Sequence, residues 1–141
     1  MAHTSVRQSI PAPAAAVWSV LGDLRSAADR WPAVEWTEFE GAGVGSVRSM
    51  HLVDGNVIRE RLEAHDPAAR CYRCEVLTFS QLPLRELHYT LKVEENGPRE
   101  CTVDWALDFE PAGAPEERVR QMLEGIYGSI RATILESLAT R

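Results

Sequence analysis

The sequence has little of several features on which common protein functions depend. Lys92 is the only lysine among fifteen basic residues, and acidic residues outnumber basic ones by 21 to 15, for a formal net charge of −6. Such a charge repels phosphate backbones and argues against non-specific nucleic-acid binding. No apolar run reaches the roughly 18–20 residues that a membrane span needs. Residues 1–7 lack the charged-then-apolar order of a signal peptide. We therefore expect a soluble, cytoplasmic protein that does not bind nucleic acid and is not an integral membrane protein.

Cysteine and histidine are scarce, and neither is placed for a metal or redox centre. The three cysteines form an odd set, which is typical of a reducing compartment. Cys71 and Cys74 make a CxxC motif, but they fall in a predicted strand, where positions three apart face opposite sides. No second CxxC accompanies them, and no two of the four histidines have metal-ligand spacing. The glycine-rich segment 41–45 precedes a strand rather than a helix, so it is not a phosphate loop. The sequence predicts neither a metal nor a cofactor.

The residues that are present have the balance of one ordinary globular domain. The chain has 141 residues, of which 45% are hydrophobic and 26% charged. A chain of this length buries roughly 68–70% of its extended surface, enough for a core without disulfides or metals. No repeat, linker or low-complexity tract interrupts it. We expect a single domain over residues 1–141.

Hydrophobic periodicity predicts an α+β domain in which most strands precede one long helix. Strands are expected where apolar residues alternate, and helices where they recur at three- and four-residue spacing. An Asp-Gly pair at 54–55 and an Asn-Gly pair at 96–97 mark hairpin turns. The predicted strands are 4–10, 34–40, 46–53, 57–65, 70–79, 86–95 and 100–109; the predicted helices are two short ones at 13–22 and 24–30 and a long one at 115–138.

The strands and the long helix each have one apolar side, so we expect them to bury these sides against one another. A curved antiparallel sheet of seven strands wrapped around one helix leaves space between the two layers. Gly125 and Gly128 lie in the middle of the predicted helix, where each costs about 1 kcal/mol relative to alanine. Two explanations for these glycines remain open. They provide room for a ligand or for the approach of another backbone segment, or they allow simple close packing of the helix on the sheet.

Five short motifs give the chain a resemblance that spans Val6 to Leu138. They are Ile10–Trp18 followed by Asp23, Trp31-Pro32-x-Val34, Gly43–Arg48, Glu60-Arg61-Leu62 followed by Asp66, and Val103-x-Trp105-x-x-x-Phe109-x-Pro111. In this order they resemble the START/Bet v 1-like superfamily (SRPBCC), in its bacterial polyketide cyclase/dehydratase branch. The resemblance implies a helix-grip fold with a deep, mostly apolar cavity that binds or transforms hydrophobic small molecules. It does not fix a reaction, because this fold serves carriers, receptors, cyclases and co-chaperones alike.

One acidic residue interrupts the predicted apolar interior. Ile58, Glu60 and Leu62 share one face of their strand, and Arg48 lies on the same face of the neighbouring strand. A carboxylate between two aliphatic residues is costly unless it is paired or protonated. Glu60 is therefore a candidate general base, or an acceptor for a ligand hydroxyl. The alternative is a structural ion pair with Arg48 that merely tolerates burial.

Two tyrosines, Tyr72 and Tyr89, are predicted to point into the same interior. Their phenols are candidates for general acids or for donors to an oxyanion. Tyrosines also fill cavities and rest their hydroxyls on backbone groups, and that interpretation is as natural here. The other side chains expected to line the cavity are Glu35, Met50, Leu52, Ile58, Leu62, Cys74, Val76, Leu87, Leu91, Trp105, Met122 and Ile126.

The first functional hypothesis is a cofactor-free polyketide-cyclase-like enzyme acting on a hydrophobic, oxygenated small molecule. In it the cavity orients the substrate, Glu60 helped by Arg48 moves a proton, and Tyr72 and Tyr89 hold developing oxyanions. The second hypothesis is a non-catalytic carrier or sensor, in which the same residues anchor a lipid-like or aromatic ligand. A third is a protein-interaction module resembling the co-chaperones of the superfamily. A homodimer is compatible with each of the three.

Overall fold

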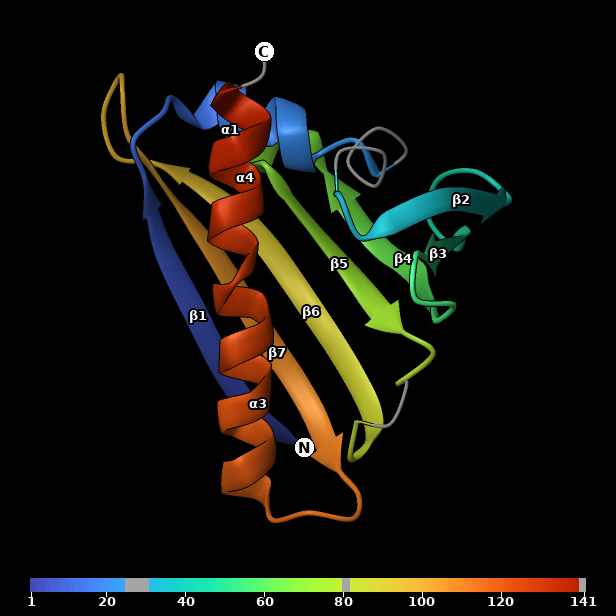
Figure 1. The fold of residues 1–141 in the computed structure, drawn as a ribbon. Coiled ribbons are helices and arrows are strands. Elements are labelled where there is room, and N and C mark those ends of the chain that lie inside the picture. The colour runs from blue at the N-terminus through green and yellow to red at the C-terminus, as the bar shows by residue number, and fades with distance from the viewer. Residues whose placement is uncertain (25–30, 80–81, 140–141) are drawn as a thin grey trace.

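The computed structural model describes residues 1–24, 31–79 and 82–139, and these form one curved sheet gripping a helical segment (Figure 1). Among the described residues, seven strands pair antiparallel in the order β1-β7-β6-β5-β4-β3-β2. The predicted helix-grip fold is therefore confirmed. The second short helix, expected at 24–30, lies almost wholly outside the described residues. The elements are β1 (Ala2–Ile10), α1 (Ala14–Leu21), β2 (Val34–Glu40), β3 (Val47–Leu52), β4 (Val57–Asp66), a 3₁₀ turn (Pro67–Ala69), β5 (Cys71–Val76), β6 (Leu84–Glu95), β7 (Cys101–Pro111), α3 (Glu116–Gly128) and α4 (Ile130–Ala139).

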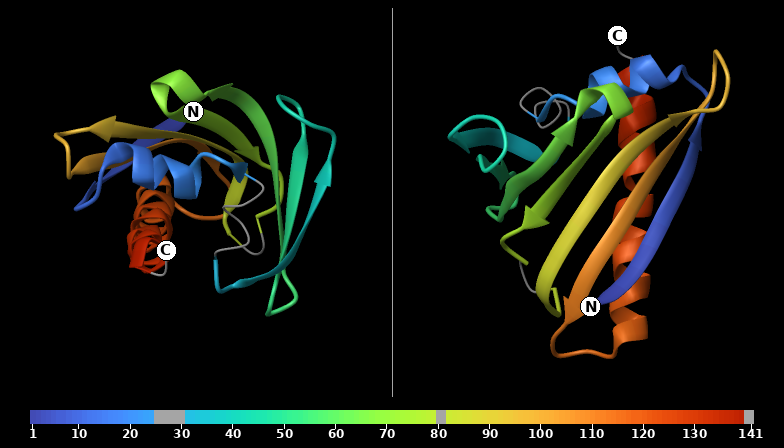
Figure 2. Two further views of the ribbon diagram at one scale, coloured as in Figure 1. Left: turned by 90° about the horizontal axis from the view of Figure 1, so that it is seen from above. Right: turned by 180° about the vertical axis from the view of Figure 1, so that it is seen from behind.

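The order of the strands places the first strand beside the last. β1 pairs with β7 along its whole length, from Ala2 opposite Phe109 to Ile10 opposite Cys101. The strands β2 to β7 follow one another as a meander of antiparallel neighbours. Figure 2 shows that the sheet curls so that α3 and α4 lie within its curve, with β2 and β3 at the far end. The concave face of the sheet therefore looks onto the helices.

The core forms where alternating side chains of the long central strands meet the helix. The odd-numbered residues of β7 from Cys101 to Phe109 are at most 2% exposed, whereas the residues between them face outward. On α3 the buried residues are Val119, Leu123 and Tyr127, which recur at four-residue spacing on one face. Period-two strands and a helical stripe thus bury each other, as their sequence patterns predict. No helix among the described residues is long and apolar enough to cross a bilayer.

The C-terminal helical segment is divided at Ser129 rather than continuous. The side chain of Gln8, on β1, reaches this division and is only 7% exposed. Its Nε2 donates to the carbonyl oxygens of Tyr127 at 3.2 Å and Gly128 at 2.9 Å. Its Oε1 accepts from Nε1 of Trp105 at 3.3 Å. The predicted long helix is present, but a buried amide on a distant strand binds carbonyls where α3 ends, which periodicity alone does not reveal.

Gly125 and Gly128 do not serve close packing. A Cβ atom built on either glycine would meet no atom of the described part of the chain within 4 Å. The expectation that the backbone approaches another element at these positions is therefore wrong. Gly125 is exposed on α3 and does not border the cavity described below.

We expect Gly125→Ala to raise the free energy of unfolding by about 0.5–1 kcal/mol, because alanine favours the helix and meets no obstacle. Gly22→Ala is the matched contrast. A Cβ at Gly22 would overlap the indole ring of Trp18, so that change should destabilise the protein. Urea unfolding followed by circular dichroism measures both changes. A loss of stability in Gly125→Ala would show that the glycine has a role in the fold that the packing does not reveal.

The convex face of the sheet carries a network of charged side chains around His88. Nδ1 of His88 lies 2.6 Å from Oε1 of Glu63, and Nε2 lies 2.6 Å from Oε2 of Glu86. Arg73 extends the network, 3.5 Å from Glu63 and 2.8 Å from Asp108. Burial by itself lowers the pKa of His88, but the two carboxylates outweigh it and raise that pKa above its ordinary value of 6.5. The raised pKa means that the folded protein favours the imidazolium.

Because the folded pKa of His88 is raised, its contribution to stability is fully present below the ordinary pKa and is lost as pH rises through the folded pKa. The wild type should therefore exceed His88→Gln by about 0.5–1 kcal/mol at low pH and lose this advantage at alkaline pH. Urea unfolding of both proteins between about pH 5 and pH 9 measures the difference. If the stability advantage of the wild type over His88→Gln grew with pH, the raised pKa of His88 would be contradicted.

Candidate active site

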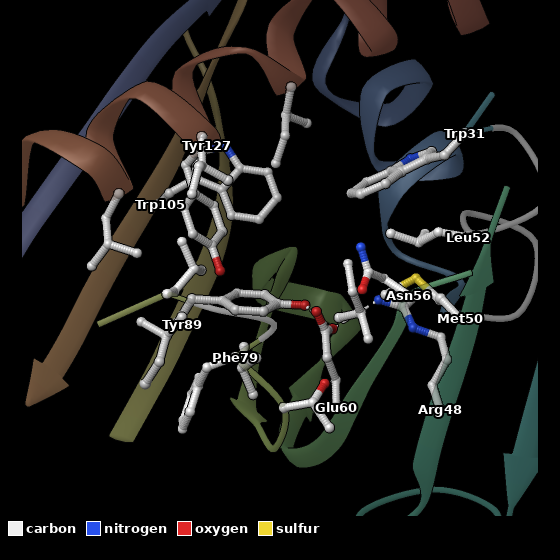
Figure 3. Close-up of a pocket in the computed structure, with 18 of the residues that line it drawn as sticks. Trp31, Arg48, Met50, Leu52, Asn56, Glu60, Phe79, Tyr89, Trp105 and Tyr127 are labelled. Carbon is white, nitrogen blue, oxygen red and sulfur yellow. Dashed lines mark hydrogen bonds and ion pairs between the residues drawn. The ribbon is translucent and has the colours of Figure 1, made fainter. Parts of the chain in front are cut away.

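A cavity of about 200 Å³ lies between the concave face of the sheet and the helices α1, α3 and α4. Most of its walls are apolar, and several aromatic rings gather on the side of α3 (Figure 3). Polar side chains gather on the opposite side, where β3 and β4 provide Arg48 and Glu60. The cavity therefore has an aromatic side and a charged side.

The charged side is built by the pairing of β3 with β4. Arg48 and Glu60 lie directly opposite each other in the antiparallel register, and they are 7% and 8% exposed. Nη2 of Arg48 donates to Oε1 of Glu60 at 2.9 Å, and Nη1 donates to the carbonyl oxygen of Leu24 at 2.9 Å. Burial lowers the pKa of Arg48, but Glu60 together with the nearby Tyr89 and Tyr72 outweighs this effect and raises that pKa above its ordinary value. The pair is thus a buried guanidinium facing a carboxylate.

Tyr89 completes the polar group from the next strand but one. Its hydroxyl donates to Oε1 of Glu60 at 2.6 Å, so both hydrogen bonds to this carboxylate fall on one oxygen. No described residue donates a hydrogen bond to Oε2 of Glu60. The second oxygen is therefore the one that can accept a proton or a hydrogen bond from a bound molecule.

Four aromatic residues form a continuous cluster along the other wall. The ring centres of Tyr72 and Tyr89 are 6.2 Å apart, those of Tyr89 and Trp105 are 5.6 Å apart, and those of Trp105 and Tyr127 are 5.3 Å apart. These spacings suit edge-to-face and tilted packing of rings. Tyr127 comes from α3, so the cluster links the helix to the sheet (Figure 3).

The three tyrosines of the cluster keep their protons over a wide pH range. Burial raises the pKa values of Tyr72, Tyr89 and Tyr127 above that of an exposed tyrosine, because the phenolate would lose its hydration. Burial likewise raises the pKa of the neighbouring Cys74 thiol to about 12. The three tyrosine hydroxyls are therefore better suited to donating hydrogen bonds than to releasing protons at neutral pH.

The structure brings most of the predicted site residues to the cavity. All four candidate catalytic residues border it: Glu60, Arg48, Tyr72 and Tyr89. Seven of the predicted lining residues border it as well: Met50, Leu52, Ile58, Val76, Leu87, Trp105 and Ile126. Leu62 and Cys74 instead border a smaller void that also touches Arg48 and Glu60.

Three predicted lining residues lie elsewhere. Glu35 is exposed, because a bulge between Val34 and Trp36 shifts the register of β2 and breaks the alternation on which the prediction relied. Leu91 is fully buried in the packed core away from the cavity. Met122 lies to one side of the helix face that meets the cavity.

Lining residues of two kinds were not predicted from the sequence. The loop residues Trp31 and Asn56 had no periodicity to assign a face, and Phe79 was expected in a strand over 70–79, whereas β5 ends at Val76. Tyr127 lay on the predicted apolar stripe of the helix, one position after Ile126, so its signal was present. Its place against Tyr89, at 5.7 Å between ring centres, depends on how α3 packs on the sheet.

The fold and this cavity define a helix-grip protein of the Bet v 1-like kind. The chain belongs to the family described as polyketide cyclase / dehydrase and lipid transport, whose profile matches residues 1–141. Members of this family bind hydrophobic small molecules. A search of curated proteins finds no match.

Several solved structures are similar to the chain over nearly its whole length. An uncharacterised protein from Bacillus thuringiensis is 24% identical with a TM-score of 0.86, and the match covers 98% of this chain and 99% of that one. The Zhui aromatase/cyclase from Streptomyces sp. R1128 is 23% identical with a TM-score of 0.73, covering 99% and 94%. Norcoclaurine synthase from Thalictrum flavum is 18% identical with a TM-score of 0.76, covering 99% and 87%. At these identities the likeness establishes the shared fold.

Removing one member of the buried ion pair should lower the free energy of unfolding more than removing both members. Arg48→Met leaves the Glu60 carboxylate buried without its cation and should lower the free energy of unfolding by about 3–5 kcal/mol. The double variant Arg48→Met/Glu60→Leu should be more stable than Arg48→Met alone. Urea unfolding of the wild type, both single variants and the double variant closes the cycle. If the loss of unfolding free energy in the double variant equals the sum of the losses in the two single variants, the two side chains do not stabilise each other.

Proposed function

We propose that this protein binds a hydrophobic, oxygenated small molecule in its cavity and catalyses a cofactor-free cyclisation with dehydration. The observation that carries the proposal is the Glu60 carboxylate, which borders an apolar cavity with Oε1 hydrogen-bonded and Oε2 left for a ligand. A carboxylate oxygen that faces a bound molecule and has no donor of its own can act as a general base toward that molecule.

The two sides of the cavity suggest how such a molecule would lie. An aromatic or polyene portion would pack against Trp105 and Tyr127, and an oxygenated end would meet Glu60 and Arg48. A flexible substrate held in one folded conformer would have its reacting carbons close together, which is catalysis by orientation. The volume of about 200 Å³ lies below the roughly 300–1,000 Å³ of pockets for drug-sized molecules, so it suits a small ligand of one or two rings.

The proton transfer assigns a separate role to each polar group. Oε2 of Glu60 would accept a proton from a carbon next to a carbonyl group, and the electron pair of that C–H bond would move onto the carbonyl oxygen as an enolate. The enolate carbon would attack a second carbonyl carbon of the same substrate, and the resulting alkoxide would take the proton back from Glu60. Loss of the new hydroxyl with a neighbouring proton would then release one water molecule.

The tyrosines would stabilise the oxygen anions formed in these steps. Their raised pKa values favour neutral hydroxyls that donate hydrogen bonds, and the charged Arg48 adds a positive field. Tyr89 already donates to Glu60 and would hold that carboxylate in place. The hydroxyls of Tyr72 and Tyr127 are the candidates for contact with the substrate oxygens.

A carrier of a lipid-like or aromatic molecule is the second candidate function. The observation in its favour is that Arg48 and Tyr89 already stabilise Glu60, as a structural ion pair would require. The family description names lipid transport beside cyclisation. Native mass spectrometry of the purified protein would reveal a co-purifying ligand and its chemical class under either candidate.

The enzyme proposal is tested by proton exchange on a small aryl ketone. We expect the wild type to speed deuterium incorporation into the methyl group of 4-hydroxyacetophenone in D₂O, because Glu60 would remove a proton next to the carbonyl. Glu60→Gln should reduce the protein-dependent rate about 100-fold or more while binding of the ketone persists. Proton NMR measures both the exchange and the binding.

Glu35→Gln is the matched control, because it makes the same chemical change at an exposed site outside the cavity. It should leave the exchange rate unchanged. Binding of the ketone with no exchange above buffer in the wild type would favour the carrier. Exchange that survives Glu60→Gln would assign the base to another residue.

A further inference from the structure

A second, smaller void touches the same ion pair as the main cavity. It has a volume of about 20 Å³ and is bordered by Ser46, Leu62, Cys74, Arg48 and Glu60, among others. Arg48 and Glu60 border the main cavity as well. The ion pair therefore separates two spaces of very different size.

The small void adjoins a pocket that reaches the surface. This outer pocket, of about 270 Å³, shares Leu24, Phe39, Ser46 and Leu62 with the void. Its other lining residues include the exposed Gly43 and Asp23. The shared side chains form the wall between the surface and the ion pair, and Ser46 is the smallest of them.

The size and chemistry of the void fit a single water molecule. A space of roughly 10–15 Å³ by this measure holds one water, provided that two to four polar groups can bind it. Arg48 borders the void, and its buried Nε–H has no hydrogen-bond partner among the residues that the structure describes. Glu60 and the Cys74 thiol also border the void, and the Ser46 hydroxyl, which donates to the carbonyl oxygen of Gly43 at 2.6 Å, keeps a lone pair for accepting.

We propose that this void is a water site and that the pocket beyond Ser46 is a second route by which water exchanges with the Arg48–Glu60 pair. The route bypasses the mouth of the main cavity, which we place beside Ile126 because this lining residue is 43% exposed. The water site rests on this geometry alone. Its use in catalysis rests on the proposed function: a proton taken up by Glu60 could exchange with solvent while the substrate still fills the main cavity.

The exchange of the Arg48 Nε–H with water tests the route without any ligand or activity. Ser46→Leu should block the wall and slow this exchange about tenfold or more, as ¹⁵N NMR with water-selective excitation would measure. Ser46→Ala is the matched control, since it loses the same hydrogen bond to Gly43 but leaves the wall open. Ile126→Trp narrows the mouth of the main cavity and should leave the rate unchanged.

The proposal would be overturned if Ile126→Trp slowed the exchange of the Arg48 Nε–H and Ser46→Leu left its rate unchanged, because water would then arrive through the main cavity. Equal exchange in Ser46→Leu and Ser46→Ala would also overturn it. If Ser46→Leu does not fold, Leu62→Phe with Leu62→Met as control probes the same wall. A high-resolution crystal structure should show a water within hydrogen-bond distance of Arg48 Nε in the wild type.

The two proposals fail separately. If the wild type binds the ketone but gives no exchange above buffer, the proposed enzymatic function falls while the Arg48 measurement stands. If Ser46→Leu leaves Arg48 exchange unchanged, the second route falls while the proposed function is unaffected.

Discussion

The buried contact between Arg48 and Glu60 is the constraint around which the rest of the site is arranged. Placing two charges where each is less than a tenth exposed is costly, and only close pairing and further hydrogen bonds offset the cost. Three partly separate parts of the chain meet that need: adjacent strands align the pair, Tyr89 donates to the carboxylate, and the backbone at Leu24 accepts from the guanidinium. The same arrangement leaves Oε2 of Glu60 and the Nε–H of Arg48 without a hydrogen-bond partner among the described residues.

Around this pair the fold combines a close-packed region with an open one. The long strands β6 and β7 and the helix α3 meet in a core where Trp105 is 2% exposed and Leu107 fully buried. Farther along the curve, β3 and β4 border the cavity of about 200 Å³, and Figure 2 shows that β2 and β3 lie at the end of the sheet away from the helices. Gln8 links the sheet to the end of α3, because it binds the carbonyls of Tyr127 and Gly128 and the indole of Trp105.

Sequence reasoning predicted the inward residues well where strands are regular. Period-two alternation placed Arg48, Glu60 and Tyr89 on the concave face, because a residue in an unbroken strand cannot change faces without shifting the register. The same reasoning failed at Glu35, where a bulge in β2 breaks the alternation. It also gave no direction for loop residues such as Trp31, since a loop has no period from which a face can be inferred.

The sequence by itself determined the class of fold, the seven strands, the helical stripe and the conflict posed by one acid among aliphatic neighbours. These follow from local patterns, because side-chain periodicity and turn residues act over a few positions. Only the tertiary structure decided which oxygen of Glu60 is occupied, where the helix divides at Ser129 and which space lies beside the ion pair. Each of these depends on groups far apart in the chain meeting at hydrogen-bond distance, and no local pattern encodes such a distance.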